Sequence, residues 1–162
     1  MEVQGYAEKI GADLTGVADL RNLEKYGTCP PDLMEGFSRG VSLAVKLTDP
    51  ALDGLPEYRE LYAHEYRTAN DLLDRISFKV SGYIEDQGFR ALPIPASQTL
   101  GGNEWSSFIS HKSIAREAGL GWIGKSLLLV NRNYGPGIRL GSVLTDAPLE
   151  HDSPVESFCG SC

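Results

Sequence analysis

The pattern of apolar and polar positions along the chain predicts helices alternating with strands. The longest periodic segment runs from about Arg59 to Asp86, where apolar or aromatic residues recur at alternating spacings of four and three. This spacing is typical of one face of a long helix, so we expect that face to pack in a core and the helix to stop at Gly88. The positions concerned are Tyr62, Tyr66, Ala69, Leu73, Ile76, Val80 and Tyr83.

Shorter segments on both sides predict further elements. Val3 to Ile10 is interpreted as a helix closed by Gly11, and Lys112 to Ala118 consists of helix formers. Alternating or continuous apolar runs of strand length predict strands elsewhere. The predicted strands are Leu14 to Leu20, Gly40 to Leu47 (stopped by Asp49-Pro50), Arg90 to Ile94, Ser126 to Val130 and Ile138 to Leu144.

Turn residues suggest how some strands are placed. Pro93 and Pro95 favour an edge or an end position for the Arg90 to Ile94 strand, because proline cannot donate to a neighbouring strand. The glycines and proline between Asn131 and Gly137 predict a hairpin that joins the last two strands. The polar stretch from Ala96 to Ser110 predicts a loop that lines a site. We therefore expect an α+β fold with a mixed or mainly antiparallel sheet covered by helices.

Composition narrows the class of protein. With 162 residues, 41% of them hydrophobic, the chain can build one domain with a core that supports itself. Fifteen Lys and Arg against 22 Asp and Glu give a net charge of −7, which disfavours nucleic acid as a partner. No apolar run has the roughly 20 residues of a membrane span, and the first residues lack the profile of a signal peptide. We expect a cytoplasmic protein that has no contact with a membrane.

Residues 119–126 (GLGWIGKS) satisfy two phosphate-binding patterns, G-x-G-x-x-G and G-x-x-x-x-G-K-[ST]. Both patterns require a strand before the glycines and a helix after them. Here the predicted helix precedes the glycines and a strand follows, so no helix N-terminus faces a phosphate. The order of elements therefore argues against a nucleotide site.

The chain ends in a C-x-x-C pair, Cys159 and Cys162. No residues remain after Cys162 to build the helix that lowers a thiol pKa in thioredoxin-type proteins, which favours metal ligation over redox exchange. A tetrahedral zinc or a four-iron cluster needs four ligands, and Cys29 is the chain's one other cysteine. The polypeptide is therefore not expected to hold either group by itself.

Several blocks taken together resemble the epoxyqueuosine reductase family and its iron–sulfur relatives. Members of that family resemble cobalamin-dependent reductases. Their N-terminal corrinoid-binding region is related to the reductive dehalogenases and is followed by a ferredoxin-like module with two four-iron clusters. The resemblance implies a corrinoid-binding domain at 1–149, followed at 150–162 by a connector and the truncated start of the cluster module. The blocks are ALPIPASQ at 91–98, HK at 111–112, AGLGWIGK at 118–125, LLLV at 127–130, YGP at 134–136, LG at 140–141, LTDAPL at 144–149 and CGSC at 159–162.

Under this resemblance, the glycine segment is predicted to bind the cofactor. Its glycines lack a Cβ and permit close approach of a flat corrin ring, and an indole and an aliphatic side chain offer apolar contact. A structural role, in which the glycines cap the helix and turn the chain, remains the alternative. Ser97 and Gln98 are predicted to add polar contacts, with a plain loop role as their alternative. The predicted cofactor-binding residues are Ser97, Gln98, Gly119, Gly121, Trp122, Ile123, Gly124 and Lys125, and the predicted metal ligands are Cys159 and Cys162.

His111 and Lys112 are the predicted catalytic residues. They stand at the start of the helix before the glycines, where a histidine near neutral pKa or a desolvated lysine can donate a proton during a reduction. An exposed pair with no catalytic role is an equally good interpretation. In the family, an aspartate in a V-D-S-A-P-like segment shortly before AGLGWIGK is taken as the proton donor. The corresponding segment here, 106–112, has no carboxylate, and only Glu104 lies upstream.

The sequence therefore predicts the N-terminal region of a cobalamin-dependent iron–sulfur oxidoreductase, inactive alone and of unknown substrate. The expected cofactors are a cobalamin and, in the complete protein, a 4Fe-4S cluster. The alternative is a non-catalytic electron-transfer or assembly module whose terminal cysteines are simply cluster ligands. A homodimer is possible, because an apolar face meant for a missing module can pair with itself.

Overall fold

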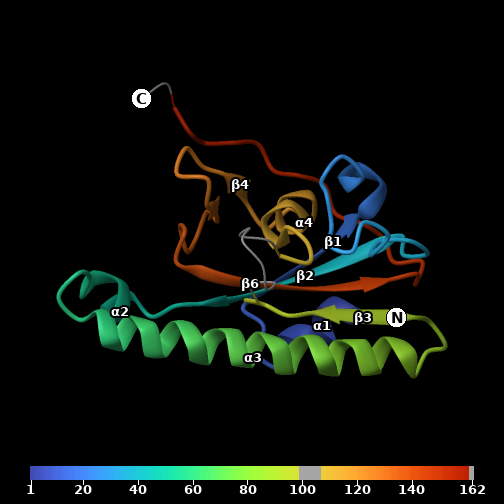
Figure 1. The fold of residues 1–162 in the computed structure, drawn as a ribbon, viewed down its shortest axis with the longest axis horizontal. Helices are drawn as coiled ribbons and strands as arrows, with labels where there is room; N and C mark the ends of the chain where they lie inside the picture. The colour runs from blue at the N-terminus through green and yellow to red at the C-terminus, as the bar shows by residue number, and fades with distance from the viewer. Residues whose placement is uncertain (99–106, 161–162) are drawn as a thin grey trace.

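The computed structural model describes residues 1–98 and 107–160 (Figure 1). Its centre is an antiparallel sheet with the strand order β1-β2-β6-β3. The strands are β1 Leu14–Asp19, β2 Arg39–Lys46, β3 Ala91–Ile94 and β6 Ile138–Thr145. Helices cover this sheet, so the α+β class and the antiparallel sheet predicted from the sequence are confirmed.

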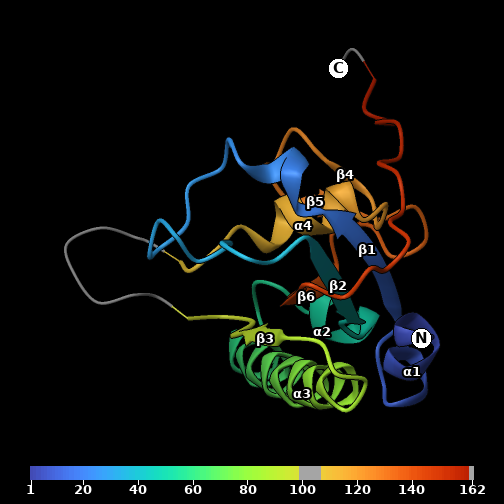
Figure 2. The same cartoon turned by 90° about the vertical axis from the view of Figure 1, so that its right-hand side faces the viewer.

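The long helix α3, Arg59–Glu85, covers one face of the sheet together with α1, Val3–Lys9 (Figures 1 and 2). The predicted stripe is confirmed, because Leu73, Ile76 and Val80 are buried against Val41, Leu43 and Val143 of the sheet. The tyrosines at the two ends of the stripe are half-buried.

The opposite face carries α4, His111–Glu117, the short 3-10 helix η1, Leu20–Leu23, and a small second sheet (Figure 2). The second sheet pairs β4, Trp122–Ile123, with β5, Leu129–Val130. A second apolar cluster fills this layer, with the buried residues Leu20, Ile114, Leu140 and Leu144 among its members. The main sheet therefore separates two cores.

The predicted hairpin between the last two strands is wrong. β5 pairs with β4 in the small sheet, whereas β6 lies between β2 and β3 in the main sheet. The residues from Asn131 to Gly137 do turn the chain, and Asn131 forms a bridge with Gly135. The pairing of β6 follows from its composition, because a strand buried at seven of its eight positions needs a neighbour on both sides.

The segment after β2 differs from the expectation. Asp49-Pro50, interpreted as a strand stop, begins the short helix α2, Asp49–Asp53, because proline is compatible with the first helical positions. Residues 150–160 have no regular secondary structure and are exposed. In the described ranges, no helix has the length and apolar character needed to cross a bilayer. The predicted loop from Ala96 to Ser110 lies partly outside the described residues.

Candidate functional site

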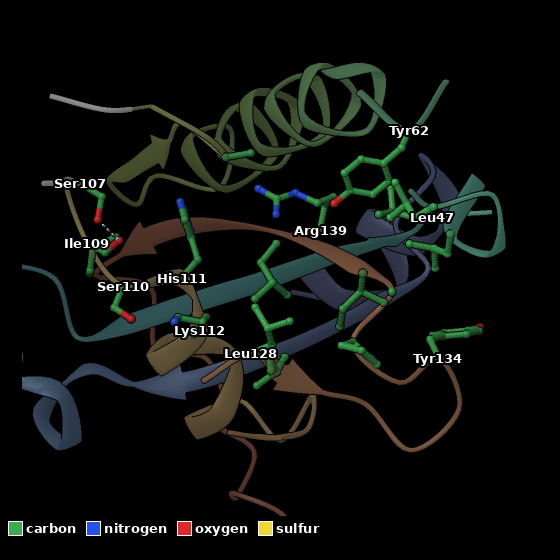
Figure 3. Close-up of a pocket in the computed structure, with 18 residues that line it drawn as sticks. Leu47, Tyr62, Ser107, Ile109, Ser110, His111, Lys112, Leu128, Tyr134 and Arg139 are labelled. Carbon is green, nitrogen blue, oxygen red and sulfur yellow. Dashed lines mark hydrogen bonds between the residues drawn. The ribbon is translucent and has the colours of Figure 1, made fainter. Parts of the chain in front are cut away.

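A cavity of about 700 Å³ opens beside the first half of β6, between the α3 layer and the α4 layer (Figure 3). Its walls are mainly apolar, with cationic and hydroxyl groups at a few points. The lining residues come from the end of β2, from α2 and α3, from the chain on both sides of Ser110, and from the segments before and within β6. They include Leu47, Leu52, Tyr62, Ala96, Ser107, His111, Lys112, Leu128, Leu129, Tyr134, Ile138, Arg139 and Leu140.

The cavity exists because β3 is shorter than β6. Ile94, the last residue of β3, pairs with Ser142, whereas β2 pairs with β6 as far as Ile138. Among the described strands, none pairs with the part of β6 from Ile138 to Gly141 on the β3 side. This backbone edge therefore offers hydrogen-bonding groups next to apolar walls, which is the usual composition of a cofactor site.

Arg139 is the charged residue of β6 at this edge. Its guanidinium donates from Nε to Asn70 Oδ1 at 3.1 Å and from one Nη to the Tyr66 oxygen at 3.0 Å. It also lies 4.1 Å from the centroid of the Tyr66 ring. Tyr66 Oη and Ser97 Oγ are 3.1 Å apart, so the candidate Ser97 belongs to the same cluster.

The surroundings of Tyr66 lower the pKa of its phenol. Burial acts to raise this pKa, but the hydrogen bonds with Ser97 and Asn70 and the charge of Arg139 outweigh burial. A tyrosine with a lowered pKa gives up its proton more readily than an ordinary one. The cluster therefore places a phenol with a lowered pKa in contact with Arg139 of the cavity wall.

His111 lines the cavity, and both of its ring nitrogens form hydrogen bonds within the protein. Nε2 donates to the carbonyl oxygen of Pro95 at 2.9 Å, which leaves Nδ1 to accept from the Ser142 hydroxyl at 2.8 Å. Burial lowers the pKa of His111, so the ring is held neutral. These contacts tie the start of α4 to β6 and to the exit of β3, which fits a positioning role.

Lys112 also lines the cavity, as Figure 3 shows. Its ammonium donates to the carbonyl oxygen of Leu127 at 2.8 Å. Leu127 has a positive φ of 62°, which is uncommon for a residue other than glycine. Lys112 therefore holds the turn that carries Leu128 and Leu129 to the cavity wall.

Ser97 and Gln98 lie around a second, smaller cavity of about 200 Å³. Ala96, Ser107 and His111 line both cavities, so the two adjoin. The structure thus brings four predicted site residues, Ser97, Gln98, His111 and Lys112, to one region. Glu104 falls in residues 99–106, outside the described residues.

The glycine segment lies elsewhere, since none of the predicted cofactor-binding residues from 119 to 125 lines the 700 Å³ cavity. The chain's own backbone fills the space beside Gly121, where a Cβ would come within 2.2 Å of the Val130 oxygen. Gly124 packs in the same way against the Val130 side chain. The helix α4 precedes the glycines, as predicted, but the first strand, β4, lies within the glycine segment, and of the predicted strand Ser126 to Val130 only Leu129–Val130 forms a strand, β5. The phosphate-binding patterns therefore have no helix after them. Cofactor binding by this segment stays a prediction from the sequence, and the function proposed below uses the cavity instead.

The cysteine pair is described in part. Cys159 is a free, exposed thiol, and Cys162 lies outside the described residues. Within residues 1–98 and 107–160, no three His, Cys, Asp or Glu side chains gather in a way that could hold a metal ion. Cys159 can thus supply one ligand to a cluster, and metal binding by the pair stays a prediction.

Sequence reasoning missed Arg139 and its partners Asn70 and Tyr66 as parts of a site. A signal was present, because Arg139 is a lone charge in a strand that is otherwise buried, and such a charge needs partners. The apolar wall at Leu128 and Leu129 had no comparable signal, since its place depends on the pairing of β4 with β5.

Comparisons with known proteins agree with the motifs. No protein-family model matches the chain. The epoxyqueuosine reductase of Aliivibrio fischeri is 29% identical over 143 residues, which is 82% of this chain and 36% of that protein. The epoxyqueuosine reductase of Leadbetterella byssophila is 26% identical over 184 aligned positions, which is 99% of this chain and 59% of that protein. The chain thus spans between about a third and three fifths of these relatives.

Solved structures show the same fold. The epoxyqueuosine reductase of Bacillus subtilis matches 99% of this chain and 48% of its own, with a TM-score of 0.69 and 20% identity. The catabolic reductive dehalogenase NpRdhA matches 95% of this chain and 22% of its own, with a TM-score of 0.76 and 17% identity. The resemblance identified from the motifs is therefore confirmed: this chain is a homologue of the epoxyqueuosine reductases that matches only a part of them, like their N-terminal part, and it has the fold they share with reductive dehalogenases.

Proposed function

We propose that this chain is the corrinoid-binding part of a cobalamin-dependent reductase. The observation that carries the proposal is the 700 Å³ cavity beside the free edge of β6. Its volume lies in the range of sites that bind drug-sized molecules, so it would receive one side of the larger corrinoid and leave the rest outside. The homology to epoxyqueuosine reductases supports the oxidoreductase class.

The lining of the cavity suits a corrinoid, which is a broad apolar plate edged with amides. Leu128, Ile138 and Leu140 provide apolar wall for the plate. The free backbone edge of β6 and the side chains of Lys112 and Arg139 provide groups that can meet its amides. When bound, the corrinoid supplies a cobalt centre for electron transfer to a substrate.

The residues of this chain are proposed to supply the proton that a reduction needs. We propose Tyr66 as the source of the proton needed in a reduction, because its phenol oxygen contacts Arg139 of the cavity wall and Ser97 of the adjoining smaller cavity. His111 is a weaker candidate, since its ring N–H is already bound to the Pro95 carbonyl oxygen. Lys112 remains a candidate as a cation at the cavity wall.

Electrons are proposed to come from a 4Fe-4S cluster that uses Cys159 and Cys162 with cysteines from outside this chain. Activity then needs more than the residues present here, and the fragment alone is proposed to be inactive. The substrate stays open, because the segment 106–112 lacks the aspartate of the family motif. A cytoplasmic location also stays a prediction.

Nucleic acid as a partner needs separate treatment. One solved epoxyqueuosine reductase, with a TM-score of 0.62, was crystallised with an epoxyqueuosine-modified tRNA stem loop. The prediction from net charge that nucleic acid is disfavoured is thus not confirmed by the comparisons. It applies to this chain alone, whose 22 acidic residues exceed its 15 basic ones.

An absorbance titration with hydroxocobalamin tests the proposal. We expect a saturable spectral change for the unmodified chain at micromolar protein. Leu128→Asp puts a charge on the apolar wall and is expected to weaken binding about tenfold or more, the worth of one buried apolar side chain. Phe78→Asp is the control, because Phe78 is 73% exposed on α3 and does not line the cavity. No spectral change with the unmodified chain would favour the electron-transfer or assembly alternative.

A further inference from the structure

The segment after β6 is attached to the domain although it has no regular structure. Asp152 donates its backbone N–H to the Val17 oxygen at 2.8 Å, and its carboxylate accepts the Val17 N–H at 2.8 Å. The same carboxylate accepts from Gln4 at 3.1 Å. Residues 150–160, which we call the connector, therefore begin with an anchor on the outer edge of β1, and Figures 1 and 2 show them continuing past α4 towards β4.

The connector then crosses the glycine segment. Gly119 has a φ of +75°, and a Cβ on it would lie 2.8 Å from the Ser153 oxygen. A residue with a side chain at position 119 would thus be strained and would push the connector away. The close passage of the connector backbone explains why position 119 is a glycine.

Further along, the connector packs on Trp122. The Phe158 ring meets the indole edge-on, with centroids 5.3 Å apart, and the Arg132 guanidinium lies 5.4 Å from the Phe158 centroid. The indole Nε1 donates to Cys159 Sγ at 3.3 Å. Trp122 therefore provides both a packing surface and a hydrogen bond for the end of the connector.

Cys159 is also held through its backbone, because its N–H donates to Ser157 Oγ at 3.2 Å. The sulfur stays exposed, so a group bound there would meet no protein wall. Ligating sulfurs of iron–sulfur clusters accept N–H hydrogen bonds of this kind.

We propose that residues 119–125 form a seat for the connector, in which Trp122 is a positioning residue that fixes the Cys159 sulfur for ligation of an iron–sulfur cluster. The cluster itself rests on the function proposed above. The seat, in contrast, belongs to residues of this chain and can be tested without cluster or corrinoid. Its failure is therefore distinguishable from a failure to bind corrinoid.

The test uses NMR spectroscopy and hydrogen exchange on the unmodified chain and on five variants. In Cys159→Ala, the Trp122 indole proton is expected to shift upfield, because it loses its acceptor. Trp122→Phe keeps a ring against Phe158 but removes the N–H, so the Asp152 amide is expected to stay protected while the Cys159 Cβ resonance shifts. Trp105→Phe assigns the two indole signals.

Gly119→Ala is expected to raise exchange of the Asp152 amide at least tenfold, because a Cβ at position 119 would meet the Ser153 oxygen and the Asp152 side chain. Gly160→Ala is its control, because a Cβ there would meet no atom within 4 Å apart from its chain neighbours. If Gly119→Ala fails to fold, the positioning role is tested by Trp122→Phe and Cys159→Ala alone. An indole proton that is unchanged in Cys159→Ala, or a Cys159 Cβ resonance unchanged in Trp122→Phe, would overturn the positioning role. An Asp152 amide that exchanges as fast as in an unfolded peptide in the unmodified chain would overturn the seat.

Discussion

The guanidinium of Arg139 donates to the phenol oxygen of Tyr66 at 3.0 Å and so joins β6 to α3 beside the cavity. Replacing Arg139 by Met removes the positive charge that favours the phenolate. We expect the pKa of Tyr66 to rise in Arg139→Met, because burial then acts with less opposition. The measurement is an absorbance titration of phenolate, with Tyr66→Phe subtracted to isolate this tyrosine. In Arg139→Lys, which keeps the charge, the pKa is expected to rise less, and equal shifts in both variants would contradict the role of charge.

His111 should make stability depend on pH in the acidic range. Its folded-state pKa is lowered, so below an unfolded pKa of about 6.5 the unfolded chain binds a proton that the folded chain does not. The free energy of unfolding is therefore expected to fall as pH drops below about 6.5, by at most about 1.4 kcal/mol per pH unit for this one group. Urea unfolding between pH 5 and pH 7.5 measures it. The histidine contribution should vanish in His111→Asn, and an unchanged slope in that variant would contradict it.

The close approach of Gly121 to Val130 should make this glycine irreplaceable. A Cβ would lie 2.2 Å from the Val130 backbone oxygen, which can move only if β4 and β5 separate. Gly121→Ala is expected to cost about 2 kcal/mol or more of unfolding free energy, as overpacking does. Gly82→Ala is the matched control, because nothing lies within 4 Å of that position on α3 and alanine should stabilise the helix by about 0.5–1 kcal/mol. Equal effects of the two substitutions would exclude the close approach.

The acidic balance of the chain gives a prediction for RNA. We expect no binding of a tRNA stem loop by this chain alone up to about 100 µM at physiological salt, which is weaker than ordinary non-specific affinity. Fluorescence anisotropy of a labelled stem loop measures it, with an epoxyqueuosine reductase as the positive control. Micromolar affinity would show that a local surface of this chain overrides its net charge of −7.

The parts of the fold with a local cause could be predicted from the sequence. The stripe on α3 follows from its own spacing, and the edge position of β3 follows from Pro93. The partner of β6 could not be found in this way, because the turn at Asn131 to Gly137 is a good hairpin turn whichever strands pair. Pairing was decided by the burial of β6, which is a property of the whole sheet.

The site was harder to predict than the fold for the same reason. Leu47, His111 and Arg139 meet only because β3 is shorter than β6 and leaves an edge free. The glycine motif was predicted to bind the cofactor, but the chain's own backbone fills the space beside Gly119 and Gly121. The sequence motifs predicted the family of homologues, whereas the position of the cavity depends on contacts between distant segments.

The most direct test of corrinoid binding in the cavity is NMR mapping of backbone amides during titration with hydroxocobalamin. We predict that the amides of Lys112, Gly137 and Arg139 shift saturably, because these residues line the cavity. The amides of Gly119 and Gly121 are expected to stay in place. Saturable shifts confined to these two glycines, or no shifts at all, would contradict the account.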